Sequence, residues 1–164
     1  MTPDDLVLTP IGLRFRGKLW PCSIAKGGLS RDKREGDGAT PRGVHRIVGM
    51  MYRADRIPAP SAWATPIGPR DLWSDDSEMP EYNLHVKAPY LGSHEQLRRA
   101  DPLYDLVIIT DWNWPNATLG KGSAIFIHQW RRPGFPTEGC VALSRENLHS
   151  IARYLSPSTR LIIK

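Results

Sequence analysis

Two residues of this sequence could form a nucleophile and its general base. His128 ends a short apolar run of β-type residues, and Cys140 opens a second apolar run after a Thr-Glu-Gly turn. Only a few per cent of an ordinary thiol is ionised at neutral pH, so a cysteine nucleophile needs a base beside it. A strand that ends in His and a segment that begins with Cys could bring the two side chains within hydrogen-bond reach, and we expect that they do.

The residues around this pair suit acyl transfer. Gly139 permits a backbone conformation that a side chain would block, and it lets the N–H groups of Gly139 and Cys140 face a developing oxyanion. Residues 129–136 join the two apolar runs and are rich in Pro, Gly and aromatic residues, which predicts an exposed but stiff loop. We interpret Cys140 as the nucleophile, His128 as the base and Gly139 as part of the oxyanion site.

These residues resemble the signature of a known enzyme family, the L,D-transpeptidases with a YkuD-type catalytic domain. That signature is a His, a loop and then Ser/Thr-x-Gly-Cys before an aliphatic residue, and it is similar to His128 followed by residues 137–141. An earlier stretch, Glu-Gly-Asp-Gly-Ala-Thr-Pro-Arg-Gly at residues 35–43, looks like the family's GDGxTPxG segment. The resemblance runs from residue 26 to residue 143 and implies a bacterial enzyme of peptidoglycan maturation.

The resemblance implies ping-pong acyl transfer. His128 would take the proton of Cys140, and the thiolate would attack a carbonyl of a peptidoglycan stem peptide to give a thioester. An amine of a second stem peptide would then form a cross-link of the 3-3 or the 1-3 type, whereas water would make the protein an L,D-carboxypeptidase. The expected partners are donor and acceptor stem peptides in the periplasm, and the resemblance implies no cofactor and no metal.

Several positions depart from the family's usual pattern. Gln129 stands where many members have Gly, Thr137 replaces Ser, Glu138 replaces His, and Ala142 replaces Arg or Asn. The loop between His128 and the Cys is also shorter than in many members. These differences affect the expected substrate contacts more than the expected chemistry, and they indicate a small, divergent branch of the family.

Two segments supply candidate substrate-binding residues. In the loop and turn before the cysteine, Arg131 and Arg132 could lower the thiol pKa or bind a substrate carboxylate. Residues 93–105 carry more polar groups than a plain connector needs, although a salt-bridged, solvated turn is the plainer interpretation. The candidates are Trp130, Arg131, Arg132, Thr137, Glu138, His94, Arg98 and Tyr104.

Three alternatives compete with the enzymatic interpretation. Cys140 could be a buried core thiol that lies beside a histidine by chance. A metallohydrolase is disfavoured because the five histidines form no His-x3-His or His-Glu-x-x-His spacing. A non-catalytic wall-binding module would keep the groove without the chemistry, and it is the strongest rival.

Composition predicts an ordinary globular domain. The chain has 164 residues, which suits one domain over residues 1–164, and we expect a monomer. The net charge is +5, but no Lys/Arg run exceeds two residues, so we do not expect a nucleic-acid surface. No apolar stretch approaches the length of about 20 residues that spans a bilayer. The first residues also lack a secretory signal pattern, which conflicts with the periplasmic substrate.

Hydrophobic patterning predicts a mainly-β fold, either a sandwich or a partly closed barrel with one or two short helices. The apolar stripe of residues 144–155 predicts a helix with Ser144 as its N-cap, and Ser93 could cap a helical turn over residues 93–100. The expected strands are residues 6–9, 13–16, 18–25, 44–52, 82–86, 106–109, 123–128, 140–143 and 160–163.

A few further residues carry structural expectations. Gly36-Asp37-Gly38 lacks the ligand spacing of a calcium or phosphate loop, so a tight turn is favoured. Cys22 lies in an apolar stretch and is expected to be a free buried thiol, and His45 is expected to pack rather than to bind a ligand. In the Pro-rich residues 53–80, Trp63 and Trp73 more often pin such a loop than line a groove. Trp112 and Trp114 could flank the site.

Overall fold

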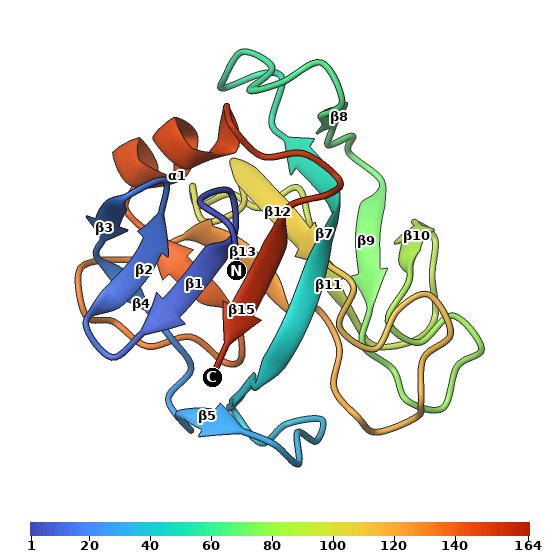
Figure 1. Cartoon of the computed structure of the whole chain (residues 1–164). Helices are drawn as coiled ribbons and strands as arrows, with labels where there is room; N and C mark the ends of the chain where they lie inside the picture. Colours follow the sequence, from blue (N-terminus) through green and yellow to red (C-terminus); the bar gives the residue numbers. More distant parts are fainter.

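The computed structural model describes residues 1–164, and one ten-stranded sheet forms its centre (Figure 1). The strand order is β3-β2-β1-β15-β7-β12-β13-β14-β4, and β8 pairs with β7 beside this path. These strands are β1 Leu6–Thr9, β2 Gly12–Phe15, β3 Lys18–Trp20, β4 Cys22–Ser23, β7 Gly43–Tyr52, β8 Thr65–Pro66, β12 Leu106–Thr110, β13 Phe126–Gln129, β14 Val141–Leu143 and β15 Arg160–Ile163.

Smaller elements surround this sheet. A three-stranded sheet has the order β10-β9-β11, and a two-stranded sheet joins β5 to β6. Their strands are β5 Leu29–Ser30, β6 Thr40–Pro41, β9 Asp71–Ser74, β10 His85–Lys87 and β11 His94–Gln96, and the one helix is α1 Arg145–Ala152. This helix is neither long enough nor apolar enough to cross a membrane.

The ten-stranded sheet bends until its two ends meet. β4, at one end of the strand order, packs against β2, which lies one strand from the other end. The result is a nearly closed barrel, and it confirms the predicted mainly-β fold with a single short helix. The chain's last strand, β15, lies between β1 and β7 in the middle of the sheet (Figure 1).

Two hydrophobic cores lie on opposite faces of the central strands. Successive side chains of a strand point to opposite faces, and β12 is buried along its whole length. Leu106 and Ile108 therefore enter the larger core with α1, whereas Val107 and Ile109 enter a second core. The second core contains Trp73 of the three-stranded sheet, so that sheet is the layer that covers this face.

Several local predictions are confirmed. The strands predicted over residues 6–9 and 13–16 are present as β1 and β2, which pair in antiparallel fashion with Thr9 opposite Gly12. The Ser144 Oγ accepts a hydrogen bond of 3.2 Å from the Asn147 N–H, so Ser144 is the predicted N-cap of α1. The predicted strand over residues 44–52 is present as β7, and its ladder with β12 shifts register beside Gly49.

Three predicted elements are wrong in detail. Residues 93–100 form no helical turn, because His94–Gln96 pairs with β9 as strand β11. The strand predicted over residues 18–25 is broken at Pro21, whose missing N–H cannot continue a ladder, into β3 and β4. The strand predicted from Tyr82 begins only at His85, because Asn83 adopts the left-handed region with φ 59°.

The tryptophans of the Pro-rich segment pin it to the protein. The Trp63 Nε1–H donates to the Leu155 carbonyl at 3.1 Å, and the Trp73 Nε1–H donates to Asn83 Oδ1 at 2.9 Å. His45 is buried against Trp112, as the packing interpretation predicted. Cys22 is free, as expected, but it is only partly buried.

The central position of β12 generates a stability prediction. Ile108→Ala should lower the free energy of unfolding by about 2–5 kcal/mol, because it leaves a cavity in the larger core between two paired strands. Ile11→Ala, at a side chain that is 75% exposed, is the matched control and should change it by less than about 0.5 kcal/mol. Urea unfolding followed by tryptophan fluorescence measures both, and equal effects would contradict this description of the core.

Candidate active site

The parallel pairing of β13 and β14 brings His128 and Cys140 to one face of the sheet. In this ladder Ile127 lies opposite Val141, and His128 lies opposite Ala142. Directly opposed residues point their side chains to the same face, and residues two apart on one strand do so as well. His128 and Cys140 therefore share the face that carries the second core, as diagonal neighbours on adjacent strands.

The turn before the cysteine is held by short hydrogen bonds. Thr137 Oγ1 donates to the Cys140 carbonyl at 2.6 Å and accepts a longer contact of 3.4 Å from the Gly139 N–H. The Thr137 N–H donates to the Ile24 carbonyl at 3.0 Å, and the Lys26 N–H donates to the Thr137 carbonyl at 2.9 Å. Thr137 therefore fixes the turn rather than facing outward as a free substrate contact.

Position 139 requires glycine because a side chain would not fit there, and not because of its backbone conformation. Its φ lies outside the left-handed region, so the expectation of an unusual backbone angle is not met. A Cβ at this position would lie 2.9 Å from Ile125 Cδ1, inside the closest normal contact. The Cys140 N–H donates to no group of the chain, so it is the better candidate of the two for an oxyanion donor.

The Cys140 thiol is buried and engaged with the backbone of the preceding segment. Its Sγ–H donates to the Ala124 carbonyl at 3.2 Å, and Sγ accepts from the Phe126 N–H at 3.4 Å. No hydrogen bond joins Sγ to His128, so the direct contact expected between thiol and imidazole is not formed in this structure. Proton transfer to the imidazole therefore requires Sγ to leave the Ala124 carbonyl.

The tautomer of His128 is fixed by a backbone carbonyl. His128 Nδ1 lies 2.8 Å from the Gln129 carbonyl oxygen, which can only accept, so Nδ1 carries the proton and Nε2 is the basic nitrogen. The Tyr104 ring packs edge-on against the imidazole, with ring centroids 5.2 Å apart. Gln129 is thus the third partner of His128, through its main chain rather than its side chain.

Burial keeps both reacting groups uncharged. Burial and, to a smaller extent, the neighbouring Glu95 carboxyl together raise the pKa of the Cys140 thiol to about 12, against smaller opposing effects of the Phe126 N–H and Lys33. Burial also lowers the pKa of His128 to about 4. A neutral thiol therefore faces a neutral imidazole at physiological pH, and the imidazole is free to accept a proton. Arg131 and Arg132 are not among the groups that shift the thiol pKa.

A pocket of about 540 Å³ opens onto this pair, and we call it the site pocket. It brings together five of the predicted substrate-binding residues with the predicted catalytic pair, and half of its lining residues come from the segment between His128 and Cys140. The lining residues are Glu95, Arg99, Leu103, Tyr104, His128, Trp130, Arg131, Phe135, Pro136, Thr137, Glu138 and Cys140. Glu138 forms an exposed ion pair with Lys26 at 2.8 Å, at the edge of this pocket.

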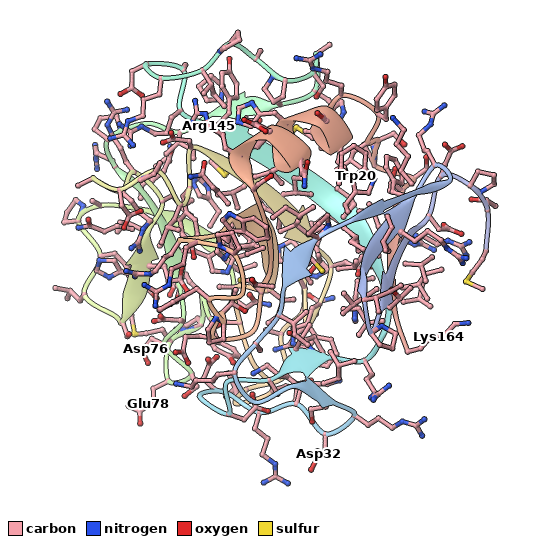
Figure 2. All side chains as sticks on the ribbon, turned by 90° about the vertical axis from the view of Figure 1, so that its left-hand side faces the viewer. Trp20, Asp32, Asp76, Glu78, Arg145 and Lys164 are labelled. Atoms are coloured by element: carbon pink, nitrogen blue, oxygen red, sulfur yellow. The ribbon has the colours of Figure 1, made fainter.

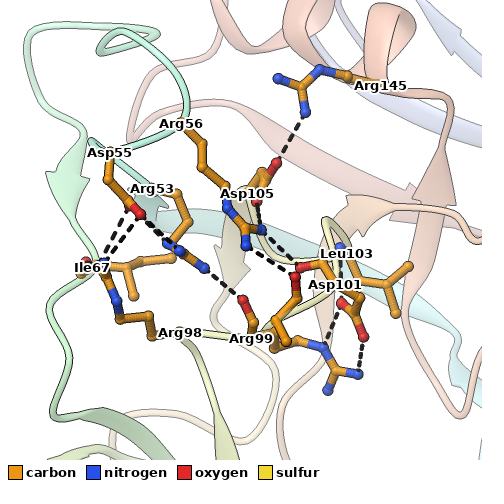
Figure 3. Close-up of polar contacts among 11 residues, drawn as sticks. Arg53, Asp55, Arg56, Ile67, Arg98, Arg99, Asp101, Leu103, Asp105 and Arg145 are labelled. Carbon is orange, nitrogen blue, oxygen red and sulfur yellow. Dashed lines mark hydrogen bonds and ion pairs between the residues drawn. The ribbon is translucent and has the colours of Figure 1, made fainter.

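Three predicted substrate residues lie outside the site pocket. Arg98 is paired with Asp55, Nη2 to Oδ2 at 3.1 Å, and it donates to the Ile67 carbonyl (Figure 3). His94 contacts the Gly92 carbonyl through Nδ1 at 2.7 Å and packs against Tyr90. The Arg132 guanidinium stacks over the Phe135 ring at 5.0 Å. Trp112 and Trp114 do not line the pocket either.

The sequence interpretation missed Glu95 and Arg99 as members of the site. The cause is the helical turn that was assigned to residues 93–100, because a strand sends His94 and Glu95 to opposite faces. Alternation along β11 would have separated these two side chains. Arg99 follows β11 and points away from its neighbour Arg98, and its guanidinium pairs with the Asp101 carboxylate at 2.7 Å (Figure 3).

The Gly-rich segment lies beside the turn that precedes Cys140. The Asp37 carboxylate accepts from Lys33 Nζ at 2.6 Å and from the Ala39 N–H at 2.9 Å, as a tight turn requires. Lys33 is buried and lies next to the Gly139 position. No group of three or more His, Cys, Asp or Glu side chains is arranged to hold a metal ion.

Comparison with known proteins identifies one family. The model of the YkuD family, described as the L,D-transpeptidase catalytic domain, matches residues 13–163. No curated protein sequence and no solved structure matches the chain.

The close approach at Gly139 predicts a specific compensation. Gly139→Ala should lower the free energy of unfolding by about 1–3 kcal/mol, because its Cβ overlaps Ile125 Cδ1. Ile125→Val removes that methyl group, so Gly139→Ala should cost markedly less in the Ile125→Val background. A double-mutant cycle by urea unfolding measures the coupling. Additive effects would show that the backbone itself, and not this contact, requires glycine.

The raised thiol pKa predicts how Cys140 reacts with alkylating agents. Iodoacetamide modifies the thiolate, so its rate at Cys140 should rise about tenfold per pH unit from about pH 7 to about pH 10 without a plateau. Peptide mass mapping separates Cys140 from Cys22, whose pKa burial raises to about 11. A plateau near neutral pH would instead indicate a preformed thiolate–imidazolium pair.

Proposed function

This chain belongs to the YkuD family of L,D-transpeptidase catalytic domains, and on that basis we propose that it transfers acyl groups between peptidoglycan stem peptides through Cys140. The observation that carries this proposal is that Cys140 and His128 share one face of the sheet and line one pocket. The pocket is large enough for a segment of peptide, and both residues contribute to its lining.

In the first half-reaction the thiol attacks a carbonyl of the donor stem. A substrate carbonyl above Cys140 draws Sγ away from the Ala124 carbonyl, and His128 Nε2 takes the proton as the C–S bond forms. Because the starting pair is neutral, proton transfer and attack are coupled rather than sequential. The Cys140 N–H stabilises the oxyanion, and the imidazolium then protonates the departing amine to leave a thioester.

In the second half-reaction an amine of an acceptor stem attacks the thioester. His128 takes a proton from the attacking nitrogen, the thiolate leaves, and the imidazolium returns the proton to sulfur. The product is a cross-link of the 3-3 or the 1-3 type. If water replaces the amine, the same steps hydrolyse the donor, which is the L,D-carboxypeptidase reaction.

The site pocket suits an anionic peptide. Arg131 is exposed in its lining and forms no ion pair, so its guanidinium is available to a stem-peptide carboxylate. Trp130 and Tyr104 add aromatic surface to the lining of the pocket. The family is related to the cell wall and typically acts outside the cytoplasm, and we place this protein in the periplasm as a monomer.

A second candidate function is a non-catalytic wall-binding domain. The observation that favours it is the resting state of Cys140, whose thiol is buried, is bonded to the Ala124 carbonyl and has a pKa raised to about 12. Such a thiol resembles a core residue more than an activated nucleophile. Covalent trapping separates the two candidates.

The proposal predicts a covalent adduct with a carbapenem, the class of inhibitor that acylates the family's cysteine. The intact-protein mass should increase by one carbapenem, and the increase should vanish in Cys140→Ala. Cys22→Ala is the matched control and should keep the adduct, because Cys22 lies outside the site pocket. His128→Ala should slow acylation by about 100- to 10,000-fold, as expected for loss of a general base.

Incubation with purified peptidoglycan identifies the reaction. Muropeptide analysis should show a new dimer that is absent with Cys140→Ala, and release of single amino acids without a dimer would indicate hydrolysis. Binding to the wall with no adduct in any variant would establish the non-catalytic domain.

A further inference from the structure

One carboxylate in the site pocket has no cationic partner. Glu95 lies in the middle of β11, opposite Trp73, and its mostly buried side chain lines the pocket beside Cys140 and Tyr104. The Tyr104 hydroxyl donates to Glu95 Oε2, whereas Oε1 accepts from no group of the chain. No Lys, Arg or His lies within ion-pair distance of this carboxylate.

The nearby cations are already engaged. Arg99 is held by Asp101 through two hydrogen bonds, of 2.9 and 2.7 Å, so its charge is largely matched. Lys26 is paired with Glu138, and Lys33 with Asp37. Glu95 thus differs from the other acidic side chain of the pocket, which has a lysine of its own.

An unpaired carboxylate in this position is costly to the folded protein. Burial of a charged group without a counter-charge is unfavourable, and burial and the nearby acidic groups do raise the pKa of Glu95. The same carboxyl also raises the pKa of the Cys140 thiol, which works against the first half-reaction. The Glu95 carboxylate therefore disfavours both the folded state and the Cys140 thiolate. A cationic ligand that binds beside the sulfur would offset both effects.

We propose that Glu95 binds the ammonium group of the acceptor in the second half-reaction and takes the proton that makes this amine nucleophilic. This inference rests on the proposed transpeptidase function. The free Oε1 is the atom available to the ammonium group, and the rigid strand β11 fixes its position. Glu95 therefore selects an amine over water at the thioester.

The chemistry balances with two separate bases. The ammonium group gives one proton to Glu95, and the resulting amine attacks the thioester carbonyl to form the C–N bond. The nitrogen gives a second proton to His128 Nε2 as the C–S bond breaks, and the imidazolium returns that proton to the sulfur. Glu95 releases its proton to solvent, so the net reaction converts thioester and ammonium to amide, thiol and one proton.

A competing explanation makes Glu95 a positioning residue. It holds Tyr104, the Tyr104 ring packs against His128, and loss of Glu95 could therefore disturb the base itself. In that case both half-reactions would slow together, with charged and uncharged nucleophiles alike. The experiment therefore compares two nucleophiles that differ in charge.

The test uses the acyl-enzyme formed with a stem tetrapeptide. Its breakdown is followed with a second stem peptide that carries a free side-chain amine, and with hydroxylamine, a nucleophile that is uncharged at neutral pH. Glu95→Gln keeps the acceptor oxygen for Tyr104 but removes the charge. Glu78→Gln removes one negative charge from an exposed site at the periphery of the molecule and is the matched control (Figure 2).

The expected result is selective. Glu95→Gln should form the carbapenem adduct at least as fast as the unaltered protein, react with hydroxylamine within about twofold, and lose about tenfold or more in kcat/KM for the amine acceptor. Glu78→Gln should change none of these. Equal losses with both nucleophiles would establish the positioning role and overturn the proposal, and so would an unchanged amine reaction. Failure of every variant to acylate would refute the proposed function instead.

Discussion

The parallel pairing of β13 with β14 is the constraint on which the site depends. It places His128 opposite Ala142 and so sends both His128 and Cys140 to the face covered by the three-stranded sheet. A register slip of one residue would turn the thiol into the larger core. The neighbours of the pair prevent such a slip, because Val141 and Ile127 are buried in that larger core and β4 closes β14 from the other side.

The same packing determines the electrostatics of the site. Enclosure by the second core removes water from thiol and imidazole alike, which is why the thiol pKa rises and the imidazole pKa falls. The Gln129 carbonyl then sets the tautomer that leaves Nε2 basic. The protein thus keeps a neutral pair rather than a standing thiolate. In the proposed mechanism, this pair becomes reactive when a substrate carbonyl draws the sulfur from the Ala124 carbonyl.

Alternating apolar residues were sufficient to predict β1, β2, β7, β12 and the barrel-like fold, and the Ser144 cap and apolar stripe were sufficient for α1. The family pattern predicted that Cys140, His128 and Gly139 lie together. Cys140 and His128 do line the site pocket, whereas Gly139 does not, and the catalytic roles of all three remain predictions. The short segments between prolines were not predictable, because their pairing with β9 depends on partners distant in the sequence. His94 and Arg98 were chosen from such a segment. His94 instead contacts the Gly92 carbonyl close by in the chain, and Arg98 forms an ion pair with Asp55, which is distant in the sequence.

The charged side chains of the site pocket indicate which charges its ligand would carry. Two of its ionised side chains are neutralised within the protein, since Arg99 pairs with Asp101 and Glu138 pairs with Lys26. Arg131 and Glu95 form no ion pair, and the first is exposed on the loop whereas the second is mostly buried beside the thiol. A substrate that carries a carboxylate and an ammonium group can match both charges at once. In the proposed mechanism, this arrangement would orient the ammonium group toward Glu95 and the thioester, and the carboxylate toward Arg131 on the loop.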